Sequence, residues 1–294
     1  MKRILTALLV ITLLFSIGCV PTDEDNGMKS TGGKGFAFTG KGGLTVEFED
    51  DSPPPINFVN DPIEIVLKLT NKGAIDLQPG DVQASLKGVA TTEIFNPSSI
   101  ESSNDDELLI AELDPTVATI DMGTITYSPE EMFSAEYKPK IEVEVCFPYT
   151  TKINADNFWI SDKQTDLSGG SISSSDNSAA PVQVKGLEEF KGTNIVRFEF
   201  TIENVGDGKV VEDCFSEEDS DPIVELNILQ PRGADCETLD GGSSGSVKLI
   251  SGKKIIRCSV SIDGDENYKT PLVADLYYNY EFEIDKTITI RNIR

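Results

Sequence analysis

The chain has 294 residues, with 50 acidic and 25 basic side chains and no histidine, so its net charge is −25. The absence of histidine excludes Ser-His-Asp and Cys-His nucleophile systems and histidine-bound zinc or haem. Nucleic acid is excluded as a partner, because binding a polyanion needs stripes of Lys and Arg that this sequence lacks. With 38% hydrophobic residues the chain can form packed cores, and at roughly 100–200 residues per domain its length suggests two domains.

The N-terminus has the pattern of an export signal. Two basic residues precede an uncharged apolar run, Ile4 to Ile17, which is too short to span a bilayer comfortably. The Gly18-Cys19 step that follows resembles the lipobox of secreted lipoproteins, in which the cysteine becomes the first mature residue and carries the lipid. We therefore expect 1–19 to be a signal peptide with the lipid on Cys19, and 20–34 to be a flexible tether. The alternatives are an ordinary cleaved signal that contains Cys19, or an uncleaved anchor.

Two groups of short segments follow, in which apolar and polar residues alternate with a period of two between clusters of Gly, Pro, Asn and Asp. This is the pattern of half-buried β-strands. The first group, within 35–165, has such segments at 44–48, 63–69, 82–86, 117–126 and 141–149. The second, within 181–294, has them at 182–187, 195–202, 223–229, 247–250, 255–262 and 271–290. Between the groups, 166–180 is rich in Gly and Ser and is interpreted as a linker or a long exposed loop.

The two groups are copies of one unit. At an offset of 133, an alternating segment that ends in Asn71-x-Gly73 aligns with one that ends in Asn204-x-Gly206. At an offset of 131, the apolar positions of 141–149 align with those of 272–280, including Tyr149 with Tyr280. Roughly seven strands per copy and few helical patterns predict an all-β protein, namely two tandem Ig-like β-sandwich domains after an N-terminal signal/lipoprotein segment.

The two turns resemble a motif of a known family. The stretches Leu69 to Ala74 and Ile202 to Gly208 look like the strand, Asn-x-Gly, Asp signature of CARDB-like and related Ig-like domains in archaeal and bacterial surface proteins. The segment Gly43 to Pro55 is similar to exported archaeal lipoproteins of this kind. The resemblance implies adhesion or envelope architecture, and it carries over no functional residue.

Four cysteines remain in an exported chain, which favours disulfides over free thiols. Cys258 shares strand parity with the apolar residues around it and so faces a core, and Cys236 lies 22 residues earlier in a Gly-rich excursion, which predicts a Cys236–Cys258 bridge. Cys146 has the opposite parity to its apolar neighbours and so faces outward. Its remaining partner is Cys214, in the other copy; two free thiols or an intermolecular pair are the alternatives.

The acidic loops are the remaining candidates for chemistry. Asp263, Asp265 and Asn267 could place three oxygen ligands on one side of a turn for a structural calcium ion, although Tyr268 stands where an EF-hand needs glycine. The alternative is a solvated acidic loop, and no other cofactor or metal is expected. The Gly-x-Ser-x-Gly pattern centred on Ser243 lacks the histidine that a nucleophile elbow requires.

The sequence thus predicts a non-enzymatic protein of the cell envelope, lipid-anchored on the extracellular face of the membrane. Its expected role is structural, adhesive or protein-binding, with a protein or glycan of the cell surface as partner. The alternative is a subunit of a surface filament or envelope layer, in which the open strand edge of one copy is completed by its neighbour, so that the protein forms a homo-oligomer.

Overall fold

The computed structural model describes residues 36–88, 94–110, 114–129, 134–160, 171–192, 194–216, 221–239, 241–262 and 268–292. These residues form antiparallel β-sheets and two short 3-10 turns, η2 (Ser174–Asp176) and η3 (Glu237–Leu239), with no α-helix among them. The all-β prediction is therefore confirmed. The expected signal peptide and tether, 1–34, lie outside the described residues.

The strands fall into two groups. The first comprises β1 (Leu44–Phe48), β2 (Ile56–Phe58), β3 (Pro62–Asn71), β4 (Gln83–Gly88), β5 (Phe95–Asn96), β6 (Glu101–Ser103), β7 (Thr116–Tyr127), β8 (Glu136–Tyr137) and β9 (Lys140–Ile160). The second comprises β10 (Val182–Gly192), β11 (Ile195–Asn204), β12 (Lys209–Val211), β13 (Ile223–Gln230), β14 (Asp235–Cys236), β15 (Ser244–Lys248), β16 (Lys253–Ser261), β17 (Tyr268–Thr287) and β18 (Thr289–Arg291).

Each group contributes one four-stranded sheet, and the two groups share a third sheet. The four-stranded sheets have the orders β1-β3-β7-β5 and β10-β11-β16-β14. The shared sheet runs β15-β13-β17-β9-β4-β6, with β12 also paired to β17. The small sheet β2-β18-β8 contains the one parallel pair of the described strands, β2 with β18. The shared sheet consists of two equivalent halves that meet between β17 and β9. β13 and β15 lie on one side of this central pair, and β4 and β6 lie on the other.

The repeat found in the sequence recurs in atomic detail at the two Asn-x-Gly turns. The amide N–H of Gly73 donates to the side-chain oxygen of Asn71 at 2.9 Å, and that of Gly206 donates to the side-chain oxygen of Asn204 at 3.1 Å. Each glycine lies against the tyrosine of its own copy. A Cβ at Gly73 would lie 1.8 Å from the Tyr149 hydroxyl oxygen, and one at Gly206 would lie 2.2 Å from that of Tyr280. Both turns therefore require glycine.

The alternating strands bury the faces that the sequence predicts. On β3 and β11 the aligned apolar residues are all at most 2% exposed. They are Ile63, Ile65, Leu67 and Leu69 on β3, and Val196, Phe198, Phe200 and Ile202 on β11. These side chains belong to one hydrophobic cluster that also includes the inward residues of the shared sheet.

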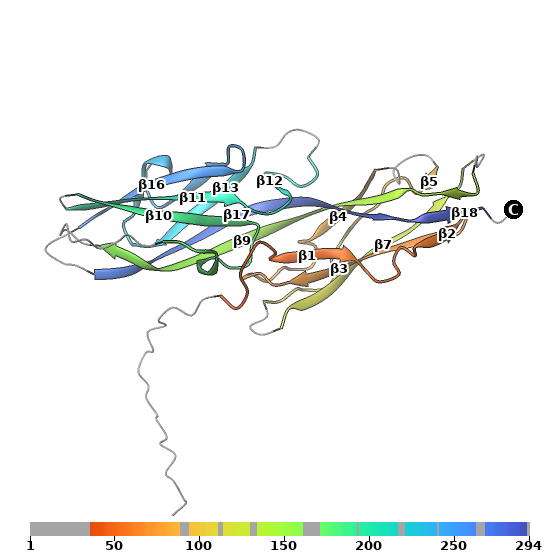
Figure 1. Ribbon diagram of the computed structural model, residues 1–294, viewed down its shortest axis with the longest axis horizontal. Coiled ribbons are helices and arrows are strands. Elements are labelled where there is room, and N and C mark those ends of the chain that lie inside the picture. The colour runs from red at the N-terminus through yellow and green to blue at the C-terminus, as the bar shows by residue number, and fades with distance from the viewer. Residues whose placement is uncertain are drawn as a thin grey trace, which may run out of the picture. The chain divides into compact units, whose positions relative to one another are not determined.

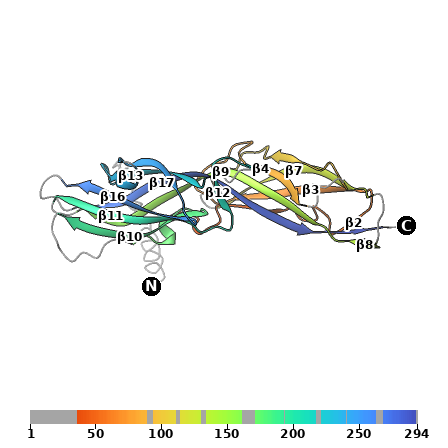
Figure 2. The ribbon, with the colours of Figure 1, turned by 90° about the horizontal axis from the view of Figure 1, so that it is seen from above.

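The centre of the shared sheet joins residues that the sequence assigns to different domains. β9 and β17 pair as antiparallel neighbours from Lys140 opposite Thr287 to Ile160 opposite Tyr268, and they run side by side in both views (Figure 1, Figure 2). Pro148 lies opposite Asn279, and these two residues are equivalent at the repeat offset of 131. A pseudo-twofold axis therefore passes between them. Beyond it, each long strand continues into the half built by the other group.

Two contacts show this continuation. The Phe158 ring, on the far half of β9, packs against Phe198 of β11 with centroids 4.9 Å apart. At the other end, β18 pairs with β2 and β8, so the C-terminal strand lies within the first group (Figure 2). The first group is thus completed by residues 280–291, from the C-terminal part of the sequence.

The segment interpreted as a linker, 166–180, lies partly outside the described residues. In its described part, 171 and 173–175 are exposed, as expected of a linker, but the end, 177–180, is buried. Asn177, Ser178, Ala179 and Ala180 are each at most 1% exposed. Ser178 N–H donates to the Lys152 carbonyl at 2.9 Å, which places this part of the segment beside β9. Its small side chains fit into a narrow space, which its Ser and Ala content allows.

Because β18 closes the first group, we expect Ile290→Ala to destabilise the whole folded unit. Ile290 is fully buried between β2 and β8, and a buried Ile→Ala change costs about 2–5 kcal/mol of unfolding free energy. Urea denaturation measures this loss. The control is Ile250→Ala, since Ile250 is 67% exposed and surface changes usually stay within about 0.5 kcal/mol. Equal effects of the two variants would show that β18 adds little to the first group.

Candidate functional site

Five aromatic side chains gather on the inward face of β9 and β17, around the pseudo-twofold axis. Neighbouring ring centroids are 5.6 to 6.4 Å apart, from Phe147 against Tyr149 to Tyr280 against Phe282. The fifth ring is that of Tyr278, whose hydroxyl lies 2.9 Å from the Thr151 hydroxyl. Such spacing is typical of favourable tilted and edge-to-face ring pairs. The cluster supplies a rigid apolar floor at the junction of the two groups.

A groove opens over one side of this floor. Its volume is about 400 Å³, and its apolar lining comes from β1 (Leu44, Val46), from β9 (Phe147) and from β17 (Tyr280, Phe282). At the rim, the Lys41 ammonium lies 2.8 Å from a carboxylate oxygen of Asp207. The turn after β11 closes one end of the groove. There, the Gly208 N–H donates to the Tyr280 hydroxyl at 2.8 Å, and a Cβ at Gly208 would lie 2.3 Å from the Glu281 carbonyl oxygen.

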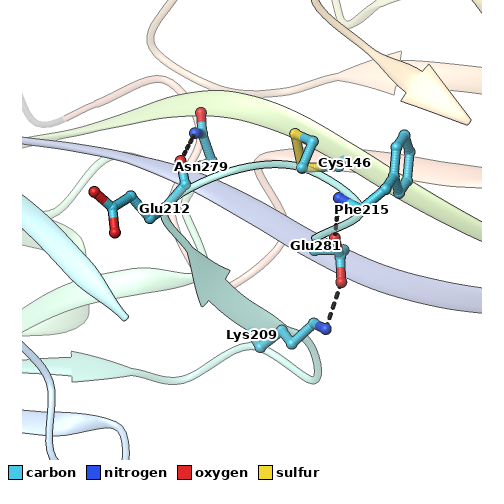
Figure 3. Close-up of a disulfide and its surroundings, with 7 residues drawn as sticks. Cys146, Lys209, Glu212, Phe215, Asn279 and Glu281 are labelled. Atoms are coloured by element: carbon cyan, nitrogen blue, oxygen red, sulfur yellow. Dashed lines mark hydrogen bonds and ion pairs between the residues drawn. A yellow bond between two sulfur atoms is a disulfide. The ribbon is translucent and has the colours of Figure 1, made fainter. Parts of the chain in front are cut away.

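The opposite face of the same two strands carries a disulfide. Cys146 of β9 is bonded to Cys214, with their Cα atoms 5.7 Å apart. As strand parity predicts, Cys146 lies on the face away from the aromatic cluster. It is, however, fully buried instead of facing solvent. The covering segment contains Glu212 and Phe215, which bond to the Asn279 and Glu281 side chains at 2.7 and 2.9 Å (Figure 3). The bond therefore holds a cover over the outer face of the shared sheet.

A pair of carboxyl groups lies beneath this cover. Glu281 is only 2% exposed, and its oxygens bond to the Lys209 ammonium at 2.6 Å and to the Phe215 N–H (Figure 3). Burial favours a raised pKa for Glu281, but the hydrogen bonds from Lys209, Phe215 and Glu144 outweigh burial and lower it. For Glu144 of β9, burial and the hydrogen bond to Glu281 raise the pKa, despite the nearby Lys87. The two shifts have opposite directions, so that when the pair holds one proton, Glu144 is the favoured carrier and Glu281 the favoured acceptor.

The second disulfide joins neighbouring strands. Cys236 of β14 lies opposite Cys258 of β16, with their Cα atoms 3.9 Å apart, and both side chains are buried. It closes the excursion between β13 and β16 that the sequence singles out. Both disulfides join the cysteines that strand parity favours.

The other sequence candidates lie outside the described residues. Cys19 belongs to the N-terminal part, and Asp263, Asp265 and Asn267 fall in the loop between β16 and β17 that the structure leaves undescribed. Among the residues that are described, no group of three or more acidic or cysteine side chains is placed to hold a metal ion. Within the same residues, no helix is long and apolar enough to cross a membrane.

Comparison with known proteins identifies no relative: neither a protein-family model nor a curated protein matches the chain.

The carboxyl pair predicts a pH-dependent stability that one substitution removes. A raised pKa of Glu144 means that stability is fully present below its ordinary value of 4.5 and is lost as pH rises through the folded-state pKa. Gln in place of Glu144 keeps a donor to Glu281 and cannot ionise. We therefore expect Glu144→Gln to match the wild type at low pH and to be more stable above it, by about 1 kcal/mol, as measured by thermal unfolding from pH 4 to 8.

The partner variant has the opposite effect. A lowered pKa of Glu281 gives stability that is present above pH 4.5 and lost as pH falls through the folded-state value. Glu281→Gln leaves Lys209 without this charge partner, so we expect a loss of about 1–3 kcal/mol at neutral pH that shrinks toward low pH. The same pH profile for both variants would rule out the assignment of the proton to Glu144.

Proposed function

We propose that the protein is an extracytoplasmic, membrane-anchored protein of two Ig-like β-sandwiches that binds another protein at the cell surface. The two disulfides indicate an oxidising, extracytoplasmic compartment. The N-terminal export pattern and Cys19 support a lipid anchor. No catalytic role is proposed, because the carboxyl pair at Glu144 and Glu281 lies beneath the disulfide-held segment and serves folding.

The Ig-like assignment rests on layers and turns. Each four-stranded sheet faces one half of the shared sheet, and the buried side chains of both layers form the core, as in a sandwich. The two Asn-x-Gly turns support the resemblance to CARDB-like surface domains. The two halves of this protein differ from simple tandem sandwiches in one respect, because β9 and β17 cross from one half into the other.

The observation that carries a binding role is the groove beside unpaired strand edges. β1 pairs only with β3, and beyond Glu281 no described strand pairs with β17 on the side away from β9. Such edges are templates for another chain, and the groove beside them has a volume of about 400 Å³. A protein partner suits these edges better than a glycan, because an extended polypeptide can pair with a strand edge through backbone hydrogen bonds.

The same edges favour the alternative role as a subunit of a filament or envelope layer, in which a second copy supplies the strand. Site-specific photocrosslinking in the native host separates the two. A photoreactive residue at Thr45, on β1 at the groove, should give a covalent adduct with an envelope protein, whereas one at Thr119, exposed on β7, should not. An adduct of twice the chain mass would establish the alternative, and equal adducts at both positions would rule out the groove.

The anchor is tested by Cys19→Ser. If a lipid on Cys19 holds the protein at the membrane, the wild type should partition into the detergent phase and the variant should not. Mass spectrometry of the mature N-terminus should find the cysteine modified. A wild-type protein with an unmodified mature N-terminus that stays in the aqueous phase would contradict the proposal.

A further inference from the structure

We infer that the groove binds an extended peptide segment of the partner protein, which adds as a strand to the free edge of β17. This inference rests on the proposed binding function and names the chemistry of its ligand: a neutral or basic segment with small side chains at its centre. The evidence comes from the second half of the protein, where the equivalent position is filled by the chain itself.

In the second half, the buried end of the segment 171–180, residues 177–180, lies between the edges of β9 and β10. Ser178 N–H donates to the Lys152 carbonyl at 2.9 Å, and the Lys152 N–H donates to the Ser178 hydroxyl at 3.0 Å. Asn177 bridges to Ile153 of β9, and its side chain bonds to both backbone groups of Val184 on β10 at 2.8 and 3.0 Å. The chain thus supplies its own filler, joined to both edges by hydrogen bonds.

The sequence repeat relates the place of this segment in the second half to the groove in the first half. At the offset of 131, Lys152 and Ile153 of β9 correspond to Glu283 and Ile284 of β17. β10 and β1 correspond through their partners, since Val182 lies opposite Asn204 and Leu44 lies opposite Asn71. The space between β1 and β17 is therefore the counterpart of the space that 171–180 fills. In the first half this space is the 400 Å³ groove.

The backbone of Glu283 is oriented for such a strand. The backbone N–H and C=O of Lys152 both bond to Ser178. Neither group therefore points toward Asp275, the residue opposite Lys152 on β17. Glu283 has the equivalent pairing, with Glu144 opposite it. In an antiparallel ladder such a residue directs both backbone groups to the other side. The Glu283 N–H and C=O therefore face the groove, where an added strand would bond to them.

The floor of the groove differs from its counterpart in a way that defines the ligand. Phe282 stands where the second half has Thr151, and Phe147 where it has Tyr278. Thr151 bonds to the Val182 carbonyl at 2.6 Å, whereas Phe282 has no polar group to bond. A larger, apolar floor leaves less depth, so the central residues of the ligand must be small. Of the charged lining residues, Lys41 pairs with Asp207, whereas Glu283 shares Lys140 with Glu142 and Asp285. The excess negative charge around Glu283 disfavours an acidic ligand.

The probe is a tetramethylrhodamine-labelled, C-terminally amidated peptide with the sequence of Ser171–Val182 and the change Asp176→Lys, which makes the peptide basic. It should bind the intact protein saturably in fluorescence polarisation. The test variant is Glu283→Pro, which removes the groove-facing N–H, and its matched control is Glu283→Ala, which loses the same charge but keeps the donor. We expect Glu283→Pro to weaken binding about tenfold or more relative to Glu283→Ala.

A second measurement avoids dependence on the proline variant. On peptide binding to the wild type, the amide of Glu283 should become protected from hydrogen exchange, while the exchange of the Thr119 amide on β7, which does not line the groove, should not change. Absence of saturable binding at millimolar peptide, equal binding by both variants, or an unprotected Glu283 amide would each overturn strand addition. Self-association of the wild type that Glu283→Pro abolishes would overturn it in favour of a second copy. The Thr45 photocrosslink decides the binding function separately, because it requires no particular peptide.

Discussion

The structure depends on the pairing of β9 with β17. Two strands of 21 and 20 residues lie antiparallel through the middle of one sheet, and everything described on either face follows from their register. On the inward face the register brings Phe147 opposite Tyr280, which builds the aromatic floor. On the outward face it brings Cys146 opposite Glu281, where the disulfide and the carboxyl pair lie. Because side chains alternate between faces, a slip of one residue would exchange the two sets.

The duplication explains the symmetry of the β9–β17 pair. The proposed binding function depends on the positions at which the two copies differ. The repeat offset of 131 relates Cys146 to Tyr277, Glu281 to Thr150 and Phe282 to Thr151. The disulfide and the buried carboxylate thus occur on one side of the pseudo-twofold axis only. On the other side, a threonine and the chain segment 171–180 fill the space with hydrogen-bonded polar groups. One half closes its strand edge internally, whereas the other leaves an apolar groove.

Strand faces, the Asn-x-Gly turns and the Cys236–Cys258 pair could be predicted from the sequence because each depends on local parity or spacing. The Cys146–Cys214 pair followed only by elimination, with free thiols and an intermolecular pair as alternatives. Strand partners could not be predicted, since alternation specifies which face a residue occupies but not which strand lies beside it. The same limit explains 177–180, whose small residues suit an exposed linker as well as a segment buried between two strand edges. It also explains Glu281, which parity directs outward but which is buried beneath Lys209 and the disulfide-held segment from Glu212 to Phe215.

Interactions on the outer face of β9 and β17 hold the strands whose inner face forms the floor of the groove. Behind Phe147 and Phe282, the strands are held by the Cys146–Cys214 bond and by the hydrogen bonds of Glu281 to Lys209 and Phe215. A strand edge that is fixed before a ligand arrives loses little conformational entropy on binding, and this cost otherwise opposes the association of an extended peptide. The buried carboxylate and the disulfide need not touch a ligand to matter for binding, because they keep the edge of β17 in the extended geometry that a new strand requires.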